Sequence, residues 1–248
     1  MRRFFAIAIC VILGVIISGF PARWALSFSG DNVKQLIDPI SVRGTVWRGE
    51  ATLSPSNLNW PIKTHYNINL MRWLGGASAL ELFIKAPGTD ITGGLSPKQA
   101  KDVVAQINVS NLPIFDPRFQ GIKGVISARI ETLDFSQGCV EAKGVMRTNV
   151  LASNQAHWQW LGPVLSGPIR CDQDRLKIEL SGEDDAQSIS AIVWLDDAGQ
   201  YDIEVLADLK ASAPPEAAFV AGALGFQETD QGFRLREKGS LYVSGLGY

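Results

Sequence analysis

Apolar and polar residues alternate along much of the chain after residue 23, and this period-two alternation is typical of strands with one buried face. Between residues 176 and 180, for example, Leu176, Ile178 and Leu180 are apolar, and the residues between them are Lys and Glu. The same alternation occurs at 47–53, 80–85, 126–131 and 201–210. The pattern predicts a strand in each of these five segments.

Turn-forming residues separate the alternating runs, at Gly75-Gly76, Pro87-Gly88, Gly93-Gly94, 136–138 and 196–199. Strands that recur roughly every 10–15 residues without regular intervening helices pair antiparallel, because βαβ units would need a helix between strands. The chain is therefore predicted to be mainly β, with an antiparallel curved sheet or a sandwich-like exported domain and two or three short helices.

Three segments depart from the alternation and predict short helices. One runs from 31 to 37 with Asp31 as its cap, and one opens with Pro214-Pro215 and stops at Gly225. The third begins at Ser96, with proline at the first helical position and a capping-box glutamine. It is predicted to continue to residue 107, with one apolar face made of Ala100, Val103, Val104 and Ile107.

The N-terminus carries an uninterrupted apolar run from residue 4 to residue 20, directly behind Arg2 and Arg3. A basic start followed by an apolar run is shared by secretory signals and membrane anchors. The run has the roughly 17 residues of the shortest spanning helices, and no clear small-x-small cleavage site follows it. We expect an uncleaved transmembrane anchor over 1–22 and an exported, periplasmic β-rich domain over 23–248.

The charge balance argues against nucleic-acid binding. The chain has 23 basic and 25 acidic residues, a net charge of −2, and no basic stripe. Phosphate neutralisation by basic residues supplies much of the affinity for nucleic acids. We expect no nucleic-acid partner.

Cys139 and Cys171 are the two cysteines of the part expected to be exported, since Cys10 lies in the apolar run. A pair in an oxidising compartment predicts a disulfide first. Two unrelated thiols are the alternative. A metal site is disfavoured because no histidine stands near either cysteine to complete a ligand set.

Few residues offer catalytic chemistry. His65 and His157 are isolated, which disfavours a histidine metal site, and the acidic groups at 183–185 and 196–197 stand in Gly-flanked turns, where they usually cap hairpins. Trp158 and Trp160 would share one face of a strand, either as a sugar- or peptide-binding platform or, more simply, as packing residues. We predict no enzyme, no metal and no cofactor.

The most distinctive segment is 42–51, which reads VRGTVWRGEA. Its simplest interpretation is the entry to a hairpin with a core tryptophan. Its Gly-Thr-Val-Trp-x-Gly-x-Ala pattern also resembles the one that follows the N-terminal anchor in type II secretion system protein N. Further similarities are the glycine-led strand at 124–133, Leu161-Gly162-Pro163-Val164, Cys171 in an Ile-Arg-Cys-Asp context, and the glycine-led end of the chain at 223–241.

The resemblance implies a single-pass inner-membrane protein whose C-terminal domain faces the periplasm, with other type II secretion components and the inner membrane as partners. It implies no catalytic residues, and structural roles for Gly44, Trp47, Gly49, Cys139 and Cys171. Two alternatives remain. One is a lipid-handling β-groove similar to AsmA-type periplasmic proteins, and the other is a carbohydrate binder that uses Trp158 and Trp160.

Overall fold

The computed structural model describes residues 21–22, 37–55, 61–69, 80–96, 98–111, 121–158, 160–230 and 232–240. The chain divides into two compact units, Met1–Ser96 and Pro97–Tyr248. Residues 1–20 of the anchor predicted over 1–22, residues 31–36 of the helix predicted over 31–37, and the predicted turn at Gly75-Gly76 lie outside the described residues, and Ile37 is the first residue of a strand. No helix within the described part is long and apolar enough to cross a membrane.

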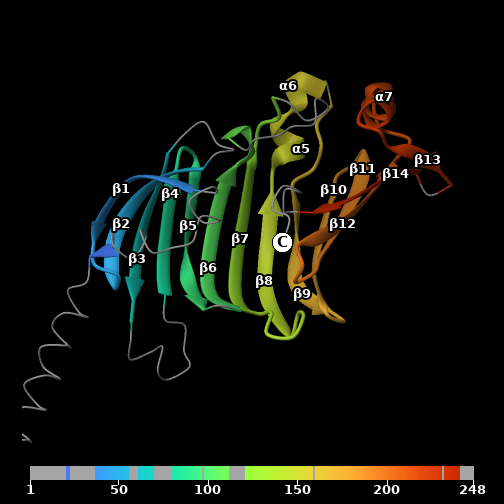
Figure 1. Cartoon of the computed structure of the whole chain (residues 1–248). Helices are drawn as coiled ribbons and strands as arrows, with labels where there is room; N and C mark the ends of the chain where they lie inside the picture. The colour runs from blue at the N-terminus through green and yellow to red at the C-terminus, as the bar shows by residue number, and fades with distance from the viewer. Residues whose placement is uncertain are drawn as a thin grey trace, which may run out of the picture. The chain divides into compact units, whose positions relative to one another are not determined.

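The first unit is an antiparallel meander in which each strand pairs with the next (Figure 1). Its strands are β1 (Ile37–Gly44), β2 (Arg48–Pro55), β3 (Ile62–Ile68), β4 (Leu80–Ala86) and β5 (Thr89–Ser96). Pro87 and Gly88 form the predicted turn between β4 and β5, with Gly88 at φ 67°. The alternation predicted at 47–53 and 80–85 is confirmed as β2 and β4.

The predicted turn at Gly93-Gly94 is wrong. Both glycines lie inside β5, where Gly93 pairs with Leu82 and Gly94 with Glu81. The physical reason is that β4 supplies backbone partners along the whole of β5, and this pairing outweighs the weak intrinsic preference of glycine for turns.

The second unit is also a single antiparallel sheet, with strand order β6-β7-β8-β9-β10-β11-β12-β14-β13. Its first half contains β6 (Gln99–Asn108), the 3-10 helix η1 (Val109–Asn111), β7 (Val125–Asp134), β8 (Glu141–Thr148), α5 (Val150–Ser153) and α6 (Gln155–Trp158). The second half contains β9 (Leu165–Asp172), β10 (Arg175–Glu183), β11 (Gln187–Leu195), β12 (Gln200–Leu209), α7 (Pro215–Ala223), β13 (Gln227–Thr229) and β14 (Gly232–Ser240). The mainly β, antiparallel prediction is confirmed, and each unit forms a sheet rather than two packed sheets.

The helix predicted from Ser96 to residue 107 is wrong, because Ser96 ends β5 and residues 99–108 form strand β6, which pairs with β7. Asp102 has φ 51°, and this irregularity shifts the strand's phase. Ala100 therefore pairs with Leu133 and Val103 with Ile130, so two apolar residues three apart reach the same face and imitate helical spacing. Val104, predicted on that apolar face, lies on the opposite one and is half exposed.

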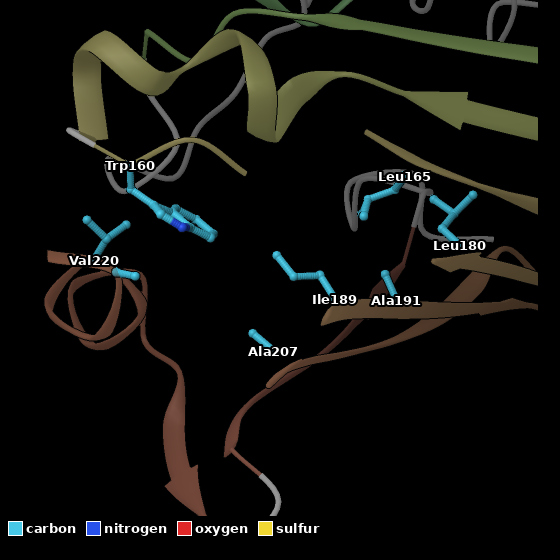
Figure 2. Close-up of a cluster of buried hydrophobic side chains, with 8 residues drawn as sticks. Trp160, Leu165, Leu180, Ile189, Ala191, Ala207 and Val220 are labelled. Atoms are coloured by element: carbon cyan, nitrogen blue, oxygen red, sulfur yellow. The ribbon is translucent and has the colours of Figure 1, made fainter. Parts of the chain in front are cut away.

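The predicted C-terminal helix is confirmed as α7, and Gly225 follows it at φ 92°, as expected of a glycine that ends a helix. The helix packs Ala217 and Val220 against the apolar face of the sheet, and Figure 2 shows Val220 close to Trp160. The centre of this cluster is well shielded, with Ile189 only 2% exposed. This part of the second unit is a true hydrophobic core.

Candidate functional site: the motif turn and the apolar sheet faces

The Gly-Thr-Val-Trp-x-Gly segment forms the turn between β1 and β2. The Thr45 hydroxyl oxygen accepts backbone N–H groups of Trp47 and Arg48, both at 3.3 Å, and the Thr45 N–H donates to the Arg48 carbonyl at 2.9 Å. Gly44 precedes this turn at φ 100°, a conformation that side chains rarely adopt. The threonine and the first glycine of the motif are therefore requirements of the turn itself.

The second motif glycine, Gly49, makes room for Tyr66. The two residues are cross-strand partners on β2 and β3, and a Cβ on Gly49 would lie 2.6 Å from the Tyr66 hydroxyl oxygen. The tyrosine ring thus passes over the glycine, and its hydroxyl donates a hydrogen bond of 2.7 Å to the Thr45 carbonyl. Partial burial raises the pKa of Tyr66 above its usual value. Tyr66 therefore holds the motif turn against β3.

Sequence reasoning missed Tyr66, because the residue lies in an alternating run whose register against β2 the sequence does not reveal.

A similar tyrosine–glycine pair occurs in the second unit. Tyr201 of β12 pairs with Gly239 of β14, and a Cβ on Gly239 would lie 2.5 Å from the tyrosine Cζ. A tyrosine opposite a glycine is thus a repeated way of filling the gap that a strand glycine leaves.

Trp47 lies in the turn before β2, not within the strand, and its side chain is partly buried. Its carbonyl accepts the Ile68 N–H at 2.6 Å, which joins the turn to the end of β3. The prediction of a core tryptophan is therefore only partly met. Gly44, Trp47 and Gly49 do meet in one turn.

The predicted disulfide is present between Cys139 and Cys171, with Cα atoms 5.5 Å apart. Cys139 is 4% exposed and belongs to a buried cluster with Ile169 and Leu176. Its N–H donates to the Asp174 carbonyl at 2.6 Å. The bond therefore ties the connection between β7 and β8 to strand β9 within the core.

The acidic turns cap hairpins, as predicted. Asp184 accepts the backbone N–H groups of Ala186 and Gln187 at 2.8 and 3.0 Å, and Asp196 accepts the N–H of Gln200 at 2.7 Å. His65 lies on the polar face of β3, with its Nδ1 3.9 Å from a Glu50 carboxylate oxygen. The described residues contain no group of three or more potential metal ligands.

Trp158 and Trp160 do not share the face of a strand, which the binding-platform alternative required. Trp158 ends helix α6, and its side chain lies outside the described part. Trp160 is 7% exposed, and its indole N–H donates at 2.6 Å to the side-chain oxygen of Gln187. The buried Gln187 also donates to the Leu161 carbonyl and to Asp184, at 2.7 and 2.8 Å. Trp160 thus serves packing, as its simpler interpretation held, and not a binding platform.

The apolar faces of the two sheets differ in how well they are covered. In the second unit, α7 and Trp160 cover strands whose apolar side chains are buried, such as Ile189 and Ala207. In the first unit, Ala51 is the only fully buried hydrophobic side chain among the described residues of 37–96. Its neighbours on the same face are half-buried, including Val42, Ile84 and Ile91. Among the described residues, the apolar face of the first unit is therefore less completely buried than that of the second.

Residues 40–236 match the family described as type II secretion system (T2SS), protein N. No curated protein and no solved structure gives a significant match. The match spans most of the chain, including the motif turn, the disulfide cysteines Cys139 and Cys171, and helix α7. The chain therefore belongs to the type II secretion system protein N family, as the resemblance of its motif turn predicted.

Proposed function

We propose that this type II secretion component is a non-enzymatic, inner-membrane-anchored protein whose β-rich part lies in the periplasm. There it assists the export of folded proteins across the outer membrane, through contacts with other type II secretion components. The family match over residues 40–236 is the observation that carries the proposal.

Two features favour a periplasmic location. The Cys139–Cys171 disulfide suits an oxidising compartment, since such bonds are rare in the cytosol. The apolar run at 4–20 behind Arg2 and Arg3 suits an anchor whose N-terminus stays in the cytoplasm. Together they support an orientation in which the C-terminal part is exported.

The placement of the polar residues favours an assembly role over catalysis. One carboxylate oxygen of Asp184 and one of Asp196 accept backbone N–H groups of their own hairpins, and the second Asp184 oxygen accepts the side-chain amide of Gln187. Glu183 is occupied by Lys210, whose ammonium lies 2.8 Å away. Three of the five candidate acids, Glu183, Asp184 and Asp196, therefore have partners within the fold.

Deletion of the gene tests the secretion role. We expect type II substrates to accumulate in the periplasm of the deletion strain, export to return with the intact chain, and tagged chain to co-purify with secretion components. Normal export of every type II substrate, with no secretion component in the purified sample, would contradict the proposal. An alkaline phosphatase fusion at the C-terminus tests the topology, and an inactive fusion would argue against a periplasmic domain.

A second candidate is lipid handling, which the half-buried apolar face of the first unit favours. A face of alternating apolar residues needs a cover, and among the described residues of 37–96 only Ala51 is a buried hydrophobic residue. An acyl chain would supply such a cover. Mass spectrometry of lipid extracted from the purified full-length protein tests this candidate, and protein that carries no lipid would rule it out.

A further inference from the structure

The polar face of the first unit carries an open cavity of about 410 Å³ over β1–β4. Cross-strand pairing aligns Arg43, Glu50, His65 and Phe83 in one row, and Arg48, Asn67 and Glu81 in the next. Since paired residues point to the same side of a sheet, all seven side chains share one face. The cavity volume falls within the range of small-molecule sites, roughly 300–1,000 Å³.

Phe83 is unusual on this face because its ring is 48% exposed among charged and amide side chains. Single exposed apolar residues are common and need no explanation by themselves. Here, however, the ring lines a cavity, and its row neighbour His65 adds a second planar side chain. The two offer a flat surface beside hydrogen-bonding groups.

The charges of the cavity balance, with two arginines and two glutamates in its lining. The ion pairs are loose. Arg43 and His65 lie 4.0 and 3.9 Å from the two Glu50 carboxylate oxygens, beyond hydrogen-bond distance. A balanced lining does not favour a phosphate or a cation, but it supplies both donors and acceptors for neutral hydroxyl groups.

We propose that this cavity binds a neutral oligosaccharide, with one pyranose ring stacked on Phe83. The C–H groups of a sugar face are slightly positive and suit the negative face of an aromatic ring. Asn67 and Arg48 donate hydrogen bonds to the sugar hydroxyls, and Glu50 accepts from them. This site belongs to the first unit and does not use Trp160, and it does not depend on the proposed role in secretion.

The test is calorimetric titration of the full-length chain, in a zwitterionic detergent without a sugar headgroup, with the β-1,4-linked tetramer of N-acetylglucosamine. We expect millimolar or tighter binding, equivalent to at least about 4 kcal/mol. Phe83→Ala should weaken binding at least tenfold, and Phe83→Trp should preserve it. Phe219→Ala is the matched control, since Phe219 is an exposed phenylalanine on α7, and it should change affinity less than twofold.

Thermal unfolding of each variant shows whether the fold is retained, and Phe83→Trp keeps the test decisive should Phe83→Ala unfold. Three outcomes would overturn the proposal. The first is a lack of binding by the tetramer, the second is binding of inorganic phosphate in its place, and the third is equal affinity of a folded Phe83→Ala protein and the unaltered chain.

Discussion

The contact between Gly49 and Tyr66 makes a sharp prediction for Gly49→Ala. The added Cβ would lie 2.6 Å from the Tyr66 hydroxyl oxygen and 2.9 Å from its Cζ, and it would also meet the Arg43 carbonyl oxygen. The carbonyl belongs to a paired strand and cannot move freely, so the tyrosine ring has to shift. The shift breaks the 2.7 Å hydrogen bond to the Thr45 carbonyl.

The expected cost combines two effects. Overpacking of a well-filled site costs about 1–3 kcal/mol, and loss of a hydrogen bond costs about 0.5–1.5 kcal/mol. We therefore expect Gly49→Ala to lower the free energy of unfolding by about 2–4 kcal/mol. Tyr66→Phe, which removes the hydrogen bond alone, should cost about 1 kcal/mol.

Urea unfolding measures the free energy, and hydrogen exchange of the peptide spanning 40–55 shows whether the loss is local to the motif turn. Gly222→Ala is the matched control. Gly222 lies in α7 with nothing within 4 Å of an added Cβ, so alanine there should stabilise by up to about 1 kcal/mol. Unchanged stability and unchanged exchange in Gly49→Ala would refute the role assigned to the glycine.

Three further predictions concern the second unit. Substituting Cys139 and Cys171 with alanine should cost about 3–4 kcal/mol in urea unfolding, because the bond closes a loop of sequence separation 32; free thiols in protein isolated from the periplasm would contradict the bond. Gln187→Ala should cost about 1–3 kcal/mol and alter Trp160 fluorescence, because it leaves a buried indole N–H without its acceptor; unaltered fluorescence would count against this. The backbone N–H of Ser136 donates a hydrogen bond to Asp134 and lowers the pKa of this carboxyl group in the folded protein below its usual value of 3.8. The stability that ionised Asp134 contributes is therefore present above pH 3.8 and is lost as the pH falls through the lowered pKa of the folded state. The stability gap between the unaltered chain and Asp134→Asn should therefore close in acid, and a gap that widens would refute the assignment.

Much of the fold could be predicted from the sequence wherever alternation was regular and turns were marked. Strand β10 illustrates this, since Leu176 and Leu180 are buried as their spacing predicted. The helix α7 was predictable too, because Pro215 and Gly225 mark its two ends.

The errors arise where tertiary pairing or backbone conformation overrides the local pattern. In β6, the left-handed conformation of Asp102 shifts the phase of the strand, so its apolar residues have the spacing expected of a helix. The Gly93-Gly94 pair looked like a turn because sequence does not show that β4 pairs across it.

The candidate site was only partly predictable. The motif identified Gly44 and Gly49, because few residues other than glycine fit a positive φ or a position without room for a Cβ. The cysteine count identified the disulfide, because only cysteine forms this bond. Tyr66 and Phe83 escaped notice, because their importance comes from cross-strand neighbours. Register is a property of the folded sheet, and one chain's alternation leaves it undetermined.

The central proposal is that this chain acts in type II secretion and that its β-rich part is exported to do so. The most direct measurement is the fraction of a type II substrate exported by a deletion strain that carries either the intact chain or no chain. The account predicts export with the intact chain and periplasmic accumulation without it. Equal export by the two strains would contradict it.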